Sequence, residues 1–412
     1  MSDTFDTVVV GAGPAGLSAA AELSRDGRCL LLERGGTASG RDRASPVDVL
    51  AGVGGAGLFS DGKHSLWPSA TALWALPEAS SLAGAFTATA DLLRRHGVDL
   101  GPLPAGPAAR FVAAGAWQQK SYPSFYVRFE DRLACIDALW AASGERRTGV
   151  QLVDAWREGP QLALALVGDD GHHEVIHTRD VIVATGRWSP LPTRPWLERV
   201  GVTYAFGRVE FGVRLEARAD NPLFARLPGV DGKLVFVDPD AGVELRTFCT
   251  CRDGEVVLGR ADGLVAYSGR ADVAPTGRSS VGLVARLTDE RRGREVAQAL
   301  RNAVPVASSL RDIRAGGAAS FVDTFGHEGA SLVWGALQRF LDAFPELGDD
   351  TSARVFAPCI EGVGDYAVDD GSLGVAPGVW VAGDAGGRFR GIVASMVSGR
   401  YAARRILARQ VR

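Results

Sequence analysis

The sequence contains few cysteines, few lysines and no long apolar run. Its five cysteines are an odd number in a chain of 412 residues, so we expect no disulfide framework and a reducing compartment. No uninterrupted apolar run is long enough to span a bilayer, and the first expected strand begins too early to leave room for a signal peptide. These absences predict a cytoplasmic protein that has no membrane partner.

Lysine occurs only at positions 63, 120 and 233, among 45 basic residues. We interpret this preference for arginine as the coding bias of a GC-rich genome, not as a sign of function. The net charge of -3 gives no reason to expect nucleic acid as a partner. The hydrophobic content of 46% and the charged content of 23% are ordinary for a soluble enzyme. The sequence gives no indication of an oligomeric state.

The stretch from residue 7 to residue 34 predicts a dinucleotide site. A short apolar run, Val8 to Val10, reads as a buried parallel strand and leads into Gly-Ala-Gly-Pro-Ala-Gly and a helical segment. The first glycine allows a tight turn, the second lets the backbone approach a pyrophosphate, and the third lets the helix pack on the strand. A second strand ends in an acid where a carboxylate accepts hydrogen bonds from a ribose diol. The residues that we expect to bind are Gly11, Gly13, Pro14, Ala15, Gly16, Glu33 and Arg34.

Two further segments are expected to approach the same ligand. Residues 52–63 are so rich in glycine that they suggest backbone pressed against a flat ligand, with Gly55 and Ser60 as contacts; a flexible surface loop is the alternative. An apolar strand from Val181 closes on Thr185 and Gly186, which also approach the dinucleotide.

Near its carboxyl terminus the chain returns to the first domain. A strand at residues 378–382 is followed by Gly383, Asp384 and a glycine-rich turn, and a helix is expected from Ile392 to Ala408.

This late motif, together with the amino-terminal one, resembles the glutathione-reductase-type flavoproteins. The resemblance implies that FAD is the cofactor, that Asp384 contacts its ribitol chain, and that Gly386 to Gly391 lies under the flavin, where Ile392 begins a helix. The positive end of that helix would then stabilise negative charge at the flavin N1–C2=O edge.

Three segments together also resemble a bacterial family of FAD-dependent dehydrogenases: residues 54–63, residues 246–251 and residues 383–392. The chain departs from that family at His64, where an apolar residue is expected, and after Cys251. The first departure suggests a specialised substrate, and with the coding bias it points to specialised metabolism.

The predicted fold is α/β, or α+β over the whole chain. We expect a Rossmann-like FAD-binding domain with a central parallel sheet, formed by residues 1–186 and 357–412, and an inserted mixed α+β substrate domain at residues 187–356. Helices are expected at Ala70 to Arg95 and at Arg128 to Ala142.

Several absent motifs narrow the reaction. No second Gly-x-Gly-x-x-Gly stands between a strand and a helix, so no nicotinamide domain is expected. The sequence also lacks the cysteine pair of disulfide reductases, the Asp-Gly signature of aromatic hydroxylases and the tryptophan motif of flavin halogenases.

These absences favour a dehydrogenase or oxidase that oxidises or reduces a small organic substrate by hydride transfer at flavin N5, with oxygen or a partner protein as electron acceptor. Two alternatives are a flavin-dependent monooxygenase, reduced by NAD(P)H or a partner reductase, and a redox-inactive binding scaffold.

Three residues are candidates for catalysis. His64 follows the glycine-rich segment and could act as general base, or simply hold the loop. Lys63 could activate oxygen or polarise a carbonyl near N5, or be a solvated loop charge. Arg390, and less strongly Arg246, could grip a substrate carboxylate.

Two other groups of residues have a chemical and a structural interpretation. Cys249 and Cys251 could be redox-active, but we favour buried packing residues. A small histidine cluster at positions 172, 173 and 177 could bind a metal, but an exposed hairpin is favoured, and we predict no metal.

Overall fold

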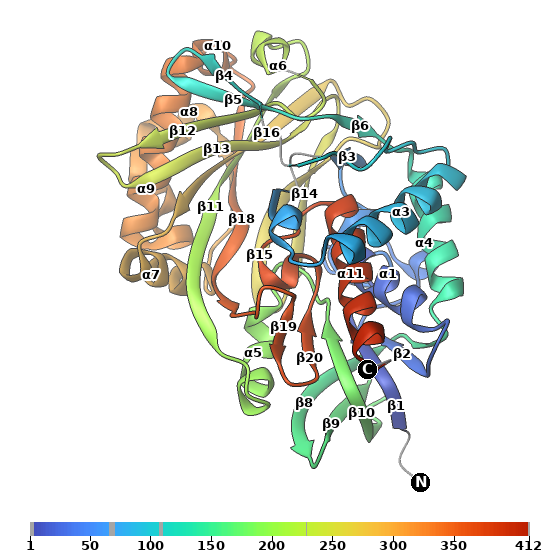
Figure 1. Cartoon of the computed structure of the whole chain (residues 1–412). Helices are drawn as coiled ribbons and strands as arrows, with labels where there is room; N and C mark the ends of the chain where they lie inside the picture. The colour runs from blue at the N-terminus through green and yellow to red at the C-terminus, as the bar shows by residue number, and fades with distance from the viewer. Residues whose placement is uncertain (1–3, 66–70, 107–109, 228, 411–412) are drawn as a thin grey trace.

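The computed structural model describes residues 4–65, 71–106, 110–227 and 229–410. Two large sheets dominate it, one built around the amino-terminal strand and the other from the middle of the chain (Figure 1). No helix of this described part is both long and apolar enough to cross a membrane.

The first sheet has the strand order β19-β20-β10-β1-β2-β7, and β8 and β9 extend it as an antiparallel meander from β10. Strand β1 lies between β2 and β10 and is parallel to both. Val8 and Val9 are fully buried because both faces of this part of the sheet are covered. The strands are β1 (Thr4–Val10), β2 (Cys29–Leu32), β7 (Glu145–Arg147), β8 (Val150–Glu158), β9 (Gln161–Gly168), β10 (His173–Val183), β19 (Gly374–Ala376) and β20 (Val379–Val381).

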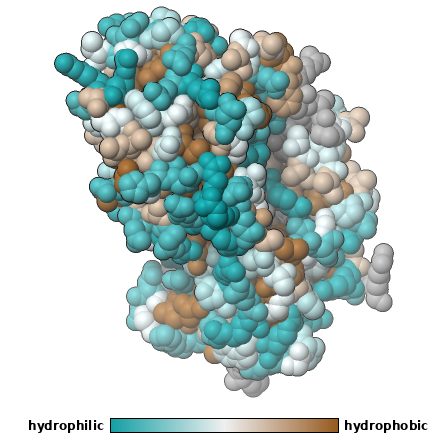
Figure 2. Space-filling view, turned by 90° about the vertical axis from the view of Figure 1, so that its left-hand side faces the viewer, coloured by the Kyte–Doolittle hydropathy of each residue, from teal (hydrophilic) through white to brown (hydrophobic). Residues whose placement is uncertain are grey.

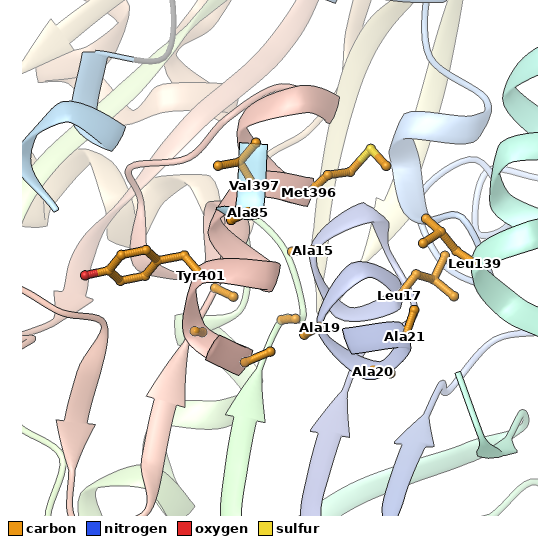
Figure 3. Packing of buried hydrophobic residues seen from close by; sticks show 14 of the residues in the cluster. Ala15, Leu17, Ala19, Ala20, Ala21, Ala85, Leu139, Met396, Val397 and Tyr401 are labelled. Carbon is orange, nitrogen blue, oxygen red and sulfur yellow. The ribbon is translucent and has the colours of Figure 1, made fainter. Parts of the chain in front are cut away.

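Helices α1 (Pro14–Leu23) and α11 (Ile392–Gln410) pack against each other on one face of this sheet, next to α3 (Ala79–Arg95) and α4 (Phe129–Ala142). Figure 3 shows the alanines of α1 between Met396 and Val397 of α11 on one side and Leu139 of α4 on the other. The approach is so close that a Cβ on Gly399 would clash with the carbonyl oxygen of Ala15. This packing brings the two ends of the chain together.

The second sheet is antiparallel, with the order β17-β18-β11-β16-β13-β12-β5-β4. Helices α7 (Glu290–Leu300), α8 (Leu310–Gly316) and α9 (Val322–Ala343) cover one of its faces. On that side of the molecule hydrophilic residues cover most of the surface, and hydrophobic residues form small separate patches (Figure 2). The strands are β4 (Arg110–Ala114), β5 (Trp117–Ser121), β11 (Tyr204–Arg218), β12 (Lys233–Asp238), β13 (Val243–Cys251), β16 (Arg278–Leu287), β17 (Val306–Ser309) and β18 (Arg354–Ala367).

Smaller elements join the two sheets. Strand β3 (Lys63–Ser65) pairs with β6 (Ser124–Tyr126), which follows closely on β5 of the second sheet. The hairpin of β14 (Glu255–Ala261) and β15 (Leu264–Arg270) reaches back toward the end of β2. Helix α5 (Pro190–Arg199) packs beside β8.

The predicted fold class is confirmed: a Rossmann-like unit with a parallel sheet is joined to a mixed α+β unit. The domain boundaries stay a prediction. Strands β4 and β5, from within residues 1–186, pair into the second sheet, and β18 runs across the predicted boundary between residues 356 and 357.

The helix at Arg128 to Ala142 is confirmed as α4, but the one at Ala70 to Arg95 is divided. Residues 71–75 form a 3-10 turn and α3 begins only at Ala79, while residue 70 lies outside the described residues. Pro77 separates the two pieces because a proline disfavours helical conformation in the residue before it.

Candidate cofactor site and active site

The glycine motif lies where β1, β10 and β20 end, at one edge of the first sheet. Gly11 has a φ of 100°, and a Cβ there would lie 2.7 Å from the carbonyl oxygen of Ala184. A Cβ on Gly16 would clash with the carbonyl oxygen of Gly11. Both positions therefore require glycine, and the turn leaves the first N–H groups of α1 pointing out from the sheet edge.

The glycine motif meets the other predicted cofactor segments here. Gly11 touches Ala184 and Thr185, and a Cβ on Gly383 would lie 2.8 Å from Cβ of Ala15. The tertiary structure thus gathers pieces from both ends of the chain at the amino terminus of α1.

The glycine-rich segment packs against the same place. Its short helix α2 (Gly55–Leu58) begins so near α1 that a Cβ on Gly55 would lie 3.0 Å from Cα of Gly13. A Cβ on Gly57 would lie 3.2 Å from Cγ1 of Ile392. The segment is closely packed, as predicted, and it packs against the first turns of α1 and α11.

Glu33 organises the loops around the motif. Its Oε2 accepts a hydrogen bond from N–H of Ala12 at 2.8 Å, and its Oε1 accepts from N–H of Gly35 at 2.9 Å and of Gly52 at 3.1 Å. A carboxylate offers about four acceptor positions, so one remains for a ribose hydroxyl. The predicted ribose contact is compatible with this geometry and stays a prediction.

Arg34 points away from the glycine motif. Its guanidinium forms a two-pronged ion pair with Asp262, in the turn between β14 and β15, with Nη2 and Oδ2 3.0 Å apart. A cavity of about 490 Å³ lies beside this pair and is lined by Gly35, Ala51 and residues 260–265. A larger cavity of about 690 Å³, next to β19 and the end of α11, contains none of the predicted site residues.

Asp384 follows β20, and only one of its two carboxylate oxygens has a hydrogen-bond partner among the described residues. Its Oδ2 accepts from Nε of Arg390 at 3.1 Å and from Nε of Arg187 at 3.2 Å. Its buried Oδ1 has no hydrogen-bond partner among the described residues. A buried acceptor left without a donor is costly, so this atom marks a place where a ligand hydroxyl would bind.

Arg390 links the two sheets instead of standing free. Its Nη1 donates to Glu210 at 3.0 Å and to Glu361 at 2.9 Å, and Nη2 donates to the carbonyl oxygen of Glu361. Burial opposes ionisation of Glu210, but Arg390, Arg208 and other arginines hold the pKa of its carboxyl well below the usual range. Since its donors are already occupied, Arg390 positions Asp384 more readily than it could grip a substrate. Its predicted catalytic role stays a prediction.

Lys63 is buried and faces the second sheet. Its Nζ lies 2.8 Å from Oδ2 of Asp61 and 3.3 Å from Oδ1 of Asp231, and it donates to the carbonyl oxygen of Thr250 at 2.9 Å. Burial alone would lower the pKa of this amine, but the two carboxylates keep it well above its usual value. Lys63 is therefore a buried cation, not a solvated loop charge.

His64, the next residue, is only 2% exposed and its ring stacks at 6.1 Å on Phe125. Burial lowers the pKa of His64 to about 4, and the charge of Arg132 acts in the same direction. Its Nδ1 has no hydrogen-bond partner among the described residues. The imidazole is thus neutral at neutral pH and able to accept a proton or a hydrogen bond.

Cys251 is buried and Cys249 half-buried, in line with the packing interpretation, but the residues around them are polar and charged. Their sulfur atoms are 3.8 Å apart, and the Cys249 thiol donates to Oδ2 of Asp61 at 2.9 Å. Fully buried Arg214 donates to Sγ of Cys251 at 3.2 Å. Burial opposes ionisation of the Cys251 thiol, but the neighbouring Cys249 and the charges of Arg214 and Lys63 lower its pKa below the usual value.

This cluster could not be predicted from the sequence. Arg214 is one of several charged residues of β11, so its charge did not distinguish it. Asp61 lies in the glycine-rich segment before β3, and Asp231 lies in a bend before β12. The cluster forms only because β3, β11 and β13 meet.

The remaining predicted residues have local roles. Oγ1 of Thr185 donates to Oγ of Ser189 at 2.5 Å, and Oγ of Ser60 donates to the carbonyl oxygen of Gly57 at 2.9 Å. Gly186 and Gly391 have φ values of 81° and 96°. The expected hairpin at the histidine cluster is the exposed turn between β9 and β10.

Comparison with protein families agrees with this geometry at the amino terminus. Residues 4–49 match the family described as FAD binding domain. A comparison with curated proteins finds no match.

Solved structures of similar fold have low sequence identity. AlpK is 15% identical, with a TM-score of 0.45 and coverage of 97% of this chain and 60% of that one. A flavoprotein/dehydrogenase from Cytophaga hutchinsonii is 12% identical, with a TM-score of 0.49 and coverage of 99% and 79%. The OxyS anhydrotetracycline hydroxylase from Streptomyces rimosus is 14% identical, with a TM-score of 0.46 and coverage of 98% and 62%. The chain thus spans about three fifths of the length of two of these proteins.

The cofactor is FAD, as the family match to residues 4–49 indicates. The geometry fits it: the turn at Gly11 and Gly16 exposes the first N–H groups of α1, and Asp384 holds a buried oxygen without a partner. The FAD binding domain is a module of flavin-dependent oxidoreductases, and this is the class of enzyme to which the site points.

Proposed function

We propose that the chain is a FAD-dependent oxidoreductase that acts as a dehydrogenase or oxidase on a small organic substrate. The observation that carries this proposal is the free, buried Oδ1 of Asp384 beside a glycine turn whose segment matches a FAD binding domain. A scaffold without redox chemistry would have no need of such an acceptor. No particular family of dehydrogenases follows from this observation.

We favour a dehydrogenase or oxidase because the described residues form one dinucleotide-binding unit. The glycines at residues 52–57 repeat the Gly-x-Gly-x-x-Gly spacing, but they lead into the four-residue α2 and do not follow a strand of the first sheet. They therefore do not build a second nucleotide-binding unit.

In this proposal FAD, when bound, accepts an electron pair from the substrate as hydride at N5. The substrate lies between the cofactor and the second sheet, on the face opposite to α7 and α9. Arg390 holds the second sheet to the cofactor domain through Glu210, Glu361 and Asp384, so the substrate space keeps its shape.

We propose that neutral His64 accepts the substrate proton at its free Nδ1. Because burial disfavours the imidazolium form, His64 would release this proton to water when the product leaves the site. The His64→Ala variant should keep FAD and lose most turnover; unchanged turnover would show that another residue holds the proton.

The visible spectrum of the purified protein tests the proposal. We expect flavin bands that persist without oxygen after NADH or NADPH is added, and that bleach when the substrate itself is added. Rapid bleaching by either nicotinamide would instead favour a monooxygenase or a reductase, and oxygen consumption coupled to a hydroxylated product would identify the former. Colourless protein that does not take up FAD would refute the proposal and support a scaffold.

A further inference from the structure

All three lysines of this arginine-rich chain meet in one place. The 45 basic residues include three lysines, which leaves 45 − 3 = 42 arginines, and the lysines are far apart in sequence. Lys120 of β5 and Lys233 of β12 are direct cross-strand partners in the second sheet. Lys63 of β3 reaches the same region, because its Nζ lies 3.3 Å from Oδ1 of Asp231, two residues before Lys233. We call Lys63, Lys120 and Lys233 the lysine cluster.

Several paired strands hold the lysine cluster in place. Tyr122, two residues after Lys120, donates its hydroxyl hydrogen to Oδ2 of Asp231 at 2.8 Å. This bond connects the end of β5 to the start of β12, and β6 then continues to pair with β3 (Figure 1). The three lysines are therefore fixed by paired strands and not gathered by flexible loops.

Only one of the three has counter-ions. Lys63 is paired with two carboxylates, whereas neither Lys120 nor Lys233 forms an ion pair or hydrogen bond with another residue in the described ranges. The carboxylates nearest to them are already engaged: Asp231 by Lys63 and Tyr122, and Glu244 by arginines of the same sheet face.

This arrangement is electrostatically unfavourable without a ligand. Like charges directly opposite each other on neighbouring strands destabilise a sheet. Burial lowers the pKa of Lys233 to about 8, and the charges of Arg246 and Lys120 act in the same direction. Burial and the charge of Arg246 also lower the pKa of Lys120. An anion placed between the two amines would relieve both effects.

We propose that Lys120 and Lys233 bind an anionic group, a carboxylate or a phosphate, on the substrate of this enzyme. The guanidinium groups that the sequence suggested for this task are occupied elsewhere: Arg390 by Glu210, Glu361 and Asp384, and Arg246 by Glu244. Among the described residues, Lys120 and Lys233 are cations on this face that form no ion pair, and an ammonium group offers three donors to such an anion.

The cluster has the right position for a substrate contact. Lys63 directly follows the glycine-rich segment that packs on α1, and Arg390 joins the same sheet face to Asp384. An anion held by Lys120 and Lys233 would anchor the substrate at the second sheet. That it is a substrate rests on the proposed function, but the binding of an anion does not.

Labelling of the lysine amines tests the proposal, because each of the three lysines can be followed separately by peptide mass spectrometry. FAD-loaded protein is treated with an amine-acetylating reagent in the presence of benzoate, inorganic phosphate or neutral benzamide, with ionic strength matched by chloride. At about ten times the Kd of the anion, acetylation of Lys120 and Lys233 should slow about tenfold. Benzamide should leave both rates unchanged, and Lys63, which is buried and ion-paired, should stay unlabelled throughout.

Protection by either anion supports the site and tells which group it prefers; equal rates with benzoate, phosphate and benzamide would overturn it. Calorimetric titration of the same anions into variants gives a second measurement. Lys120→Gln and Lys233→Gln should each lose most of the binding, and Lys233→Arg should retain it. Arg311→Gln, which removes one exposed charge on α8, is the matched control.

Variants are compared only when they retain the flavin spectrum, so a misfolded protein is not scored as a loss of binding. Because labelling requires no turnover, its outcome is independent of the flavin-bleaching experiment. If anions protect the lysines of a protein whose flavin is never reduced, the proposed oxidoreductase function is refuted but the proposed anion site at Lys120 and Lys233 is supported.

Discussion

The buried imidazole of His64 should make the stability of this protein depend on pH. Its folded pKa is about 4, whereas an unperturbed histidine has a pKa of about 6.5. Between these values the unfolded chain binds more protons than the folded one, so acid favours unfolding. The contribution of neutral His64 is complete above pH 6.5 and is lost as the pH falls toward 4.

The size of the effect follows from the two pKa values. The fall in the pKa of His64 from about 6.5 to about 4 lowers the free energy of unfolding by about 2 kcal/mol at pH 5 and by about 3 kcal/mol at pH 4. The perturbation is His64→Asn, which removes the titrating group and keeps a polar side chain of similar length.

The assay is urea unfolding followed by tryptophan fluorescence at several pH values between 7.5 and 4. Wild type should lose about 2 kcal/mol more than the Asn variant between pH 7.5 and pH 5. His172→Asn, in the exposed turn between β9 and β10, should follow wild type and serves as control. Equal pH dependence of wild type and His64→Asn would refute the argument, because it would mean that His64 titrates alike in both states.

Three further variants address the cofactor site and the thiol cluster. Asp384→Asn should weaken FAD binding about tenfold in a fluorescence titration, because the hydrogen bond that Oδ1 accepts is no longer assisted by the carboxylate charge; unchanged affinity would mean that this oxygen does not contact FAD. Gly16→Ala should lower the free energy of unfolding by about 3 kcal/mol, whereas Gly36→Ala, with open space around it, should stay within about 0.5 kcal/mol; similar values for both would contradict the close packing of α1 on its strand. Arg214→Met should raise the pKa of Cys251, measured by thiolate absorbance against pH, and destabilise the protein by about 3 kcal/mol; an unmoved pKa would show that Arg214 does not stabilise the thiolate.

The sequence was sufficient for the local chemistry of the amino-terminal segment. The turn at Gly11 depends on backbone conformation and close approach within a few residues, and these constraints leave a pattern in consecutive letters. The same holds for helix α4, whose periodicity is local. Where a proline intervened, as at residue 77, the predicted boundary was wrong by several residues.

The pairing of charges could not be read from the sequence. Arg390 was expected to bind substrate, but its guanidinium instead donates hydrogen bonds to Glu210 of β11 and Glu361 of β18. Cys249 and Cys251 were expected to be packing residues, but Asp61 approaches them from the loop before β3 and Arg214 from β11. Such partners are separated by long stretches of chain, and nothing local records them.

The three lysines show most clearly which properties followed from the sequence and which depended on the tertiary structure. The sequence by itself determined that the chain has three lysines, a FAD-binding turn and an acid at the end of a late strand. Only the tertiary structure decided that the lysines meet, that Lys63 has counter-ions and that Lys120 and Lys233 have none in the part of the chain it describes. The reason is physical: a turn is fixed by the dihedral angles of adjacent residues, whereas the energy of a charge depends on every group that folding brings within a few ångströms of it.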